Sequence, residues 1–247
     1  SPTLLWERSA GDGISNSDYI GQISGQPAIA QVADGTWSVL IGNGYNSSQN
    51  KSALLQFAIS DGTLTVHTTD TSTDTGLAAA VTWISNVSNG ISTTAYAGDL
   101  KGRVWAFGLN DGTSSTPSSA GVRMFTTADA STGGKAQPIT AGLLAGKDPK
   151  TGNVWLFFGT GKYLTQTDLD NTDKQTWYGI IVQSTTASLV SNLATWTGSR
   201  TAGSGNALVP RSITAQADAT STKLASRTIT VPTAGDMAAK SGWFIDL

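Results

Sequence analysis

Few residues in this chain have the types needed for catalysis or for binding a transition metal. The chain contains one histidine, His67, and no cysteine. His67 lies in the alternating segment TLTVHT, and we expect it on the outward face of a strand. A Ser-His-Asp triad remains an alternative, but no G-x-S-x-G turn is present. A single histidine without cysteine also leaves zinc without its usual nitrogen and sulfur ligands.

The densest group of carboxylates is the segment DLDNTD, which contains Asp168, Asp170 and Asp173. Carboxylate oxygens are the ligands that Ca²⁺ prefers. The segment lacks the glycine and the terminal glutamate of an EF-hand loop, and its spacing is irregular. We therefore interpret it as a solvated loop and keep a calcium site as the alternative. Asp99 follows a glycine at a strand end, where its carboxylate can accept backbone N–H groups across a turn, so we predict a structural role.

Glycine-rich turns and overall charge point away from nucleotides and nucleic acids. Gly42-Asn43-Gly44 and Gly159-Thr160-Gly161 lack the P-loop pattern and precede no helical segment, so we interpret them as strand-end turns. The formal net charge is −2, and no basic patch for nucleic acid is apparent. No window approaches the ~18 consecutive apolar residues of a membrane helix, so we expect no membrane insertion.

The elements that would position these residues are predicted to be short antiparallel strands. In the segment YAGDLKGRVWAFGL, large apolar residues alternate with small ones, which is the period of a strand. Asp-Gly and Asn-Gly dipeptides follow such segments and indicate hairpin turns. A first strand is expected at residues 4–8. The pattern recurs about every 45–55 residues, the size of a four-stranded propeller blade.

We therefore predict an all-β fold: a β-propeller of four-stranded antiparallel blades, about five of them in this chain. Its eight Trp residues are expected to supply much of the surface between blades. Residues 1–247 are expected to form one propeller domain, truncated at both ends relative to a longer parent protein. The ring is accordingly expected to be incomplete or to be part of a larger one.

An ordered set of motifs resembles the C-terminal propeller of the PilY/PilC family of type IV pilus-tip proteins. These motifs are GNGYNS, YAGDLKGRVWAF, QPIT, FGTGKYL, QTWYGI and GWFIDL. The resemblance implies a bacterial surface protein, exported through the periplasm, that acts at the pilus tip with the minor pilins. It also implies roles in pilus extension, adhesion, twitching motility and surface sensing.

The resemblance further implies a calcium loop just before the YAGD strand. The positions that correspond to the family's ligands are Ser85, Val87, Asn89, Ile91 and Thr93. The Asn-Gly turn is retained, but the run contains no carboxylate, and Val87 has no ligating side chain. Calcium affinity depends on the number of charged ligands. We therefore expect a metal-free hairpin here and no cofactor, although relatives can hold calcium.

The main functional hypothesis is a non-enzymatic interaction module whose loops contact pilus-tip partners. The same loops could also bind a host or surface ligand. Specificity is expected in the loops at residues 110–120, 165–174 and 197–206, because loops on a rigid scaffold tolerate change. Two alternatives stay open. One is a quinoprotein-like enzyme, favoured by strand endings such as AFGLNDG; the other is a carbohydrate-binding propeller that uses exposed Trp or Tyr as stacking surfaces.

Overall fold

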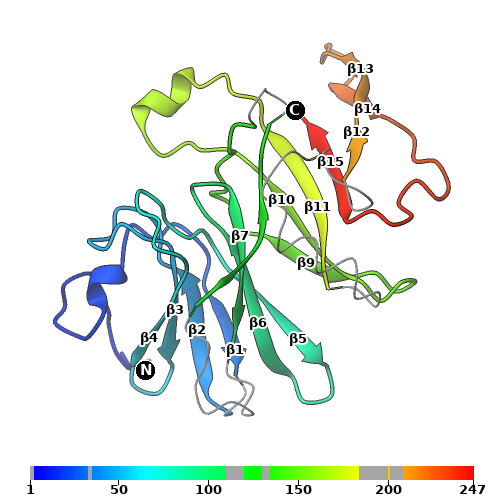
Figure 1. Cartoon of the computed structure of the whole chain (residues 1–247). Coiled ribbons are helices and arrows are strands. Elements are labelled where there is room, and N and C mark those ends of the chain that lie inside the picture. Colours follow the sequence, from blue (N-terminus) through cyan, green and yellow to red (C-terminus); the bar gives the residue numbers. More distant parts are fainter. Residues whose placement is uncertain (1–2, 33–34, 110–119, 130–133, 184–199, 201–207) are drawn as a thin grey trace.

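The chain folds almost entirely into β-strands in a computed structural model that describes residues 3–32, 35–109, 120–129, 134–183, 200 and 208–247 (Figure 1). Within these ranges there are fifteen strands and two short 3-10 helices, η1 (Ser17–Tyr19) and η2 (Gln166–Asp170). The predicted all-β class is confirmed.

The first sheet is a four-stranded antiparallel meander in which each strand pairs with the next along the chain. Its last hairpin turns at Asp61-Gly62, where Gly62 has φ +70° and the Asp61 carboxylate accepts the Thr63 N–H at 2.9 Å. The Asp-Gly turn predicted at this position is therefore present. The strands are β1 (Ala28–Gln31), β2 (Trp37–Gly42), β3 (Ala53–Ala58) and β4 (Leu64–Thr68).

The second sheet repeats the meander and contains the YAGD segment. β6 and β7 are joined by a tight turn in which Gly102 takes φ +73°. Register shifts interrupt the pairing of β5 with β6. The strands are β5 (Val81–Asn86), β6 (Ile91–Gly98), β7 (Arg103–Gly108) and β8 (Val122–Thr126).

The third sheet has five strands in the order β12-β15-β11-β10-β9, and β12 pairs parallel to β15. The remaining two strands form a separate hairpin beside β12 in Figure 1. The sheet strands are β9 (Leu144–Lys147), β10 (Val154–Gly159), β11 (Thr176–Gln183), β12 (Val209–Arg211) and β15 (Gly242–Asp246). The hairpin consists of β13 (Ile213–Ala217) and β14 (Ser226–Ile229).

The blade count of about five is wrong for the described residues, which form three larger sheets and one hairpin. The C-terminal segment GWFIDL does not open a further blade. It forms β15, which pairs antiparallel with β11 and extends the third sheet. The strand-like segments RSITA and SRTITV pair with each other as the exposed β13–β14 hairpin. A repeat length therefore overestimates the number of blades when distant strands join one sheet.

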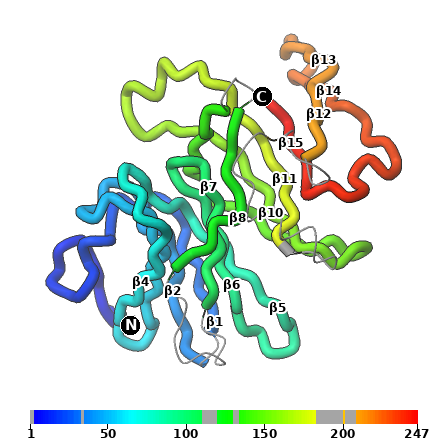
Figure 2. Tube along the Cα trace, in the orientation of Figure 1, coloured from blue at the N-terminus to red at the C-terminus, as the bar shows by residue number. Residues whose placement is uncertain are grey.

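The three sheets pack face to face in chain order, as the trace in Figure 2 shows, with β1 contacting β5 and β6, and β5 contacting β9. This face-to-face packing of two four-stranded sheets and one five-stranded sheet is propeller architecture. Between the first and second sheets lies one apolar core, formed in part by Leu40, Leu54, Ala95, Trp105 and Phe107.

A second, larger core joins the second and third sheets. Its members include Val104, Phe125, Leu156, Phe158 and Tyr178. The Tyr178 ring contacts Phe125 edge-on with centroids 5.3 Å apart and stacks on Phe158 at the same distance. The prediction that Trp supplies much of the surface between blades is wrong for most of the described Trp residues, because only Trp105, which is buried, and Trp83, which is partly buried, pack in the cores between sheets.

The strand expected at residues 4–8 is also absent, and this N-terminal segment packs on the outer face of the first sheet instead. Trp6 stacks on Phe57 with centroids 5.9 Å apart, and its indole N–H donates to the Ile59 carbonyl at 2.8 Å. Arg8 donates to the carbonyls of Gly62 and Asp61 at 2.9 Å each. The segment has strand-like composition but no neighbouring strand to pair with in this part of the fold.

Candidate functional site

One local arrangement recurs in all three sheets: a glycine followed by a polar residue at the end of one strand. The pairs Gly42-Asn43, Gly98-Asp99 and Gly159-Thr160 end β2, β6 and β10. The strand-end turns predicted at these positions are therefore confirmed.

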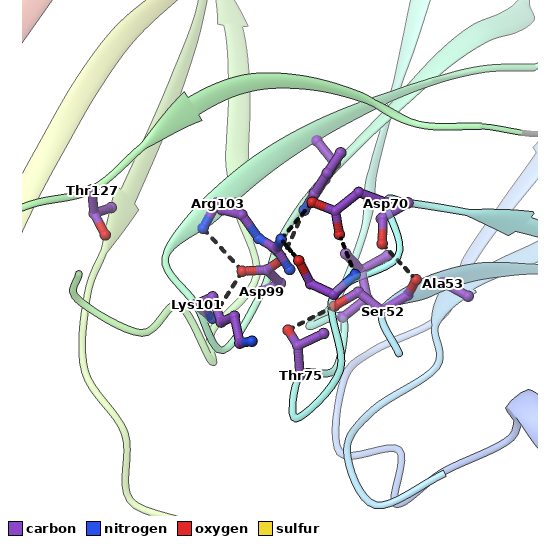
Figure 3. A network of polar contacts seen from close by, with 12 residues as sticks. Ser52, Ala53, Asp70, Thr75, Asp99, Lys101, Arg103 and Thr127 are labelled. Carbon is purple, nitrogen blue, oxygen red and sulfur yellow. Dashed lines mark hydrogen bonds and ion pairs between the residues drawn. The ribbon is translucent and has the colours of Figure 1, made fainter. Parts of the chain in front are cut away.

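Asp99 is fully buried and holds the turn between β6 and β7. Its Oδ1 accepts the backbone N–H groups of Lys101 at 2.9 Å and Arg103 at 3.0 Å. Its Oδ2 accepts the Arg103 Nε–H at 2.7 Å and the Trp105 indole N–H at 2.8 Å. Four charge-assisted bonds satisfy this carboxylate, as Figure 3 shows in part, and they give it the structural role predicted from the sequence.

Arg103 extends this network to the segment that connects the first and second sheets. Its Nη1 donates to Asp70 and to the Ser72 hydroxyl, both at 2.8 Å (Figure 3). Partial burial works to raise the pKa of Asp70, but the hydrogen bonds from Ser72 and Arg103 outweigh burial and lower it. The network therefore stabilises the junction between the first and second sheets, and its hydrogen bonds have a structural role.

Asn43 and Thr160 do the same work at the equivalent turns. Asn43 Oδ1 accepts the N–H groups of Ala53 at 3.0 Å and Leu77 at 3.1 Å, so one amide holds its own sheet and the entry to the next. Thr160 Oγ1 accepts the N–H of Thr176, the first residue of β11, at 2.8 Å. These turns organise the blades.

A second buried network in the third sheet was missed by the sequence reasoning. Arg200 forms an ion pair with Asp246, and the Thr176 hydroxyl donates to the same carboxylate at 2.7 Å. Gln137 donates to Thr176 at 2.8 Å and accepts the Tyr178 hydroxyl at 2.8 Å. Burial raises the pKa of Tyr178 to about 12, so its hydroxyl stays protonated. The partners are up to 70 residues apart, and no local pattern indicates their pairing.

His67 is buried, with 2% of its surface exposed, so the prediction of an outward-facing residue is wrong. It lies opposite Leu54, a member of the core between the first two sheets. The alternate residues Leu64 and Val66 pack against the other face. Both faces of the first sheet are covered, so alternation does not identify a solvent face there. His67 Nε2 is 2.9 Å from Gln56 Oε1, and burial lowers the pKa of the ring.

The three acidic residues of the DLDNTD loop have separate surroundings. Asp168 accepts the N–H groups of Leu164 and Thr165 at 2.9 Å each and lies 2.9 Å from the Lys162 ammonium. The Leu164 amide and the Lys162 ammonium hold the pKa of Asp168 far below its ordinary value. Asp173 pairs with Lys135 instead. Among the described residues, no group of three or more His, Asp or Glu is close enough to hold a metal ion.

The hairpin between β5 and β6 contains the five positions that the family resemblance marked as calcium ligands. The hydroxyls of Ser85 and Thr93 are 2.7 Å apart and bond to each other. Asn89 Oδ1 accepts the Ile91 N–H at 3.0 Å. Val87 is 88% exposed and carries no ligating atom. Hydroxyl and amide oxygens without a carboxylate are a poor match for Ca²⁺.

The outward face of the third sheet carries an aromatic surface that the described residues leave partly open. Side chains at alternate positions of β9, β10, β11 and β15 point away from the core between the second and third sheets. Trp155 stacks nearly parallel to Phe157, with centroids 5.9 Å apart and planes at 4°. The ring centroids of Phe157 and Trp243 are 6.3 Å apart. We call Trp155, Phe157, Trp177 and Trp243 the aromatic face.

Glycines shape this face. A Cβ on Gly179 would lie 2.6 Å from the Trp243 ring, so the absence of a side chain lets that indole lie flat on the sheet. Next to the rings is a pocket of about 320 Å³, which is lined by Gly146, Lys147, Asp148, Trp155, Phe157 and Trp243. The alternation in NVWLFFG could have identified Trp155 and Phe157 as one face, but it could not show which face stays open.

None of the helices in the described ranges has the length and apolar character needed to cross a membrane. The predicted loops at residues 110–120 and 197–206 lie almost wholly outside the described residues. The third loop, residues 165–174, contains η2.

Comparison with known proteins gives consistent matches. Residues 7–222 match the PilY1 β-propeller domain family. The chain is 39% identical over 183 residues to a type IV pilus biogenesis factor PilY1 homolog of Xylella fastidiosa, an alignment that covers 74% of this chain and 14% of the relative. It is 31% identical over 274 residues to type IV pilus biogenesis factor PilY1 of Pseudomonas aeruginosa strain PAO1, covering 98% of this chain and 22% of the relative.

A solved structure has the same fold. The crystal structure of the Pseudomonas aeruginosa PilY1 C-terminal domain matches with a TM-score of 0.70 and 28% identity, over 93% of this chain and 51% of that chain. The chain thus spans less than a quarter of the length of the two curated relatives and about half of the solved domain.

Proposed function

Because the chain belongs to the PilY1 β-propeller family, we propose that it is the propeller module of a type IV pilus biogenesis factor. The module catalyses nothing in this proposal. It acts at the bacterial surface, at the pilus tip, where it docks the minor pilins during pilus extension. Attachment and twitching motility depend on it because both require extended pili.

The observation that carries this proposal is the family match over residues 7–222, which includes both junctions between the sheets. Asp99 and Arg103 bond to each other and stabilise one junction between sheets, and His67 is buried against Gln56. The residue types that sequence reasoning considered for chemistry are thus used for stability. A rigid stack of sheets with an aromatic surface suits recognition of other proteins.

The aromatic face is the surface through which we propose that the module joins a further β-sheet of the longer parent protein. Two interfaces of the same kind already exist in the stack, since each sheet presents alternate apolar side chains to its neighbour. The aromatic face would form a third interface of this kind. On the opposite side of the stack, Trp6 and Ile20 pack on the outer face of the first sheet.

Complementation tests the proposed role directly. A strain that lacks the full-length protein receives either the intact gene or a gene from which the 247-residue module has been removed. We expect the intact gene to restore surface pili and twitching, and the shortened gene to restore neither. Normal pilus numbers with the shortened gene would refute a role in biogenesis. Immunoblotting of both products provides the control for expression.

Carbohydrate binding is a second candidate function, and the pocket beside the aromatic face favours it. Its volume of about 320 Å³ lies at the lower end of the range for small ligands. Trp155 and Phe157 provide the stacking surface, and Lys147 and Asp148 are polar groups at its edge. A glycan array probed with the isolated chain separates the two functions. Reproducible binding that Trp155→Ala abolishes would favour the carbohydrate function.

A further inference from the structure

The β5–β6 hairpin stands where the family resemblance implies a calcium loop, and its geometry disagrees with that role. We infer that the Ser85–Thr93 hydrogen bond takes the place of the ion, which makes this hairpin independent of calcium. Ser85 and Thr93 occupy the first and last of the five ligand positions. Their hydroxyl oxygens are 2.7 Å apart. Two oxygens at that separation bond to each other through a proton.

The backbone explains how these two side chains meet. The register of β5 against β6 shifts between Trp83 and Ile84 and again between Ile84 and Asn86, so Ser85 lies at an irregularity in the ladder. Such bulges redirect a side chain relative to the regular alternation. The Ser85 hydroxyl therefore reaches Thr93 on the facing strand. The hairpin is closed by its own atoms.

The two asparagine side chains of the loop also form hydrogen bonds within it. Asn86 Oδ1 accepts the Ser88 N–H at 3.0 Å, and Asn89 Oδ1 accepts the Ile91 N–H at 3.0 Å. Both contacts are Asx turns, in which the side chain stabilises the local backbone bend. Gly90 completes the bend with φ +69°. The turn is therefore shaped by side-chain amides.

Charge leads to the same conclusion. Residues 85–93 contain no Asp or Glu, and Val87 occupies a ligand position with 88% of its surface exposed. Neutral oxygens alone do not compensate for removing the hydration shell of a divalent cation, and affinity falls with each lost carboxylate. This inference concerns only the hairpin and its ion, so it stands or falls independently of the role in pilus biogenesis.

Calorimetric titration of the 247-residue chain with CaCl₂ tests the inference. We expect no saturable heat from the hairpin, and the same Tm in millimolar CaCl₂ as in EGTA. Saturable binding that Asn89→Ala abolishes would overturn the inference. Binding that persists in Asn89→Ala but is lost in the double variant D170N/D173N would assign the ion to the acidic loop and leave the inference standing.

A gain-of-function variant provides the matched control. We expect S85D/V87N/N89D/T93D to bind CaCl₂ and to gain about 5 °C or more in Tm when millimolar CaCl₂ is added. If this variant fails to fold without the ion, refolding that requires CaCl₂ is the same positive result. Its failure to bind calcium in any form would overturn the assignment of these positions as the ligand loop.

The hydrogen bond itself has a separate test. Thr93→Val keeps the shape of the side chain and removes the hydroxyl. We expect a fall in Tm of about 1–3 °C that is equal in CaCl₂ and in EGTA. A fall that appears only when CaCl₂ is present would mean that Thr93 binds the ion, and would overturn the inference.

Discussion

At the scale of single residues, the polar groups most suggestive of chemistry serve the junctions between sheets. Asp99 accepts four hydrogen bonds while fully buried, and two of them come from Arg103. Breaking a buried ion pair by removing one partner leaves an uncompensated charge, which is more costly than the pair itself is stabilising. Asp99 is therefore the residue at which a minimal change has the largest expected effect.

We predict that Asp99→Asn lowers the free energy of unfolding by about 3–5 kcal/mol. The amide would place an NH₂ group or a neutral oxygen against the Arg103 and Trp105 donors and leave the guanidinium with only the partly exposed Asp70 as its counterion. Urea denaturation followed by Trp fluorescence measures the change. The control is Asp218→Asn on the exposed hairpin, which should alter stability by no more than about 0.5 kcal/mol. Equal effects of the two substitutions would contradict the account.

His67 gives the protein a specific dependence on pH. Burial lowers the pKa of its ring below the ordinary 6.5, so the folded state holds the neutral form while the unfolded chain takes up a proton near pH 6.5. The unfolded state therefore binds more protons as the pH falls through this range, and stability decreases. The stabilisation is complete above pH 6.5 and is lost as the pH falls toward the lowered value.

We predict that wild-type stability declines as the pH falls below 6.5, whereas His67→Gln shows a flatter profile in the same range. Glutamine does not titrate, and it can bond Gln56 as the histidine does. Hydrogen bonds that outweigh partial burial lower the pKa values of Asp70 and Asp246 below 3.8, so their contributions are lost at more acidic pH. Denaturation series at matched ionic strength make the comparison. Identical slopes for the two proteins would exclude His67 as the cause.

At the scale of elements, each sheet is joined to the next through a strand end that tolerates only glycine. A Cβ on Gly42 would lie 1.9 Å from the Ala78 carbonyl oxygen, and one on Gly98 would lie 2.3 Å from the Ile139 side chain. Ala78 lies in the segment that leads into the second sheet, and Ile139 lies in the segment that leads into the third. The N–H of Ala78 donates to the Gly98 carbonyl at 2.9 Å, and that of Ile139 to the Asp99 carbonyl at 3.0 Å.

We predict that Gly42→Ala destabilises the chain by about 3 kcal/mol, because the opposing atom is backbone and cannot move aside without shifting the junction. Gly108→Ala is the matched control, since a Cβ there meets nothing within 4 Å and Gly108 also ends a strand. It should be neutral or slightly stabilising. Thermal unfolding by circular dichroism measures both. Tolerance of Gly42→Ala would show that the sheets are not held as closely as described.

The sequence predicted elements better than their assembly. Hairpins at Asp61-Gly62 and Lys101-Gly102 and the strand ends at Gly42, Gly98 and Gly159 follow from local turn chemistry, and all are present. Two predictions were wrong, the strand at residues 4–8 and the number of blades. Both depend on which segments become neighbours in the fold. Pairing of β15 with β11 joins residues about 70 apart, and alternation within a segment carries no information about such partners.

The same limit applies to the candidate sites. The structural role of Asp99 could be predicted because its hydrogen-bond partners lie within a few residues of it. The hairpin at residues 85–93 could be tested for calcium binding from the sequence because the five ligand positions lie in one short segment. His67 was misplaced, since burial on both faces of a sheet is a property of the stack. The ion pair of Arg200 and Asp246 was missed because the groups that bury these two residues come from segments far apart in the sequence.

At the scale of the whole molecule, the stack of three sheets has unlike ends. The first sheet is covered on its outer face by the N-terminal segment, whereas the third presents the aromatic face. Trp177 is 50% exposed there, and Leu144 next to Phe157 is 66% exposed. An exposed apolar surface of this kind marks an interaction site. We therefore propose that docking takes place at the third sheet and that the junctions provide stability.

The decisive measurement is the number of surface pili in a strain whose full-length protein carries W155S/F157S. We expect few or no pili, while the isolated 247-residue chain with the same substitutions still folds, with a lowered Tm because both side chains are partly buried. The control, L224S/V231S, removes two apolar residues that are 91% and 80% exposed on and beside the β13–β14 hairpin, and should leave pili unchanged. Wild-type pilus numbers with W155S/F157S would contradict the account.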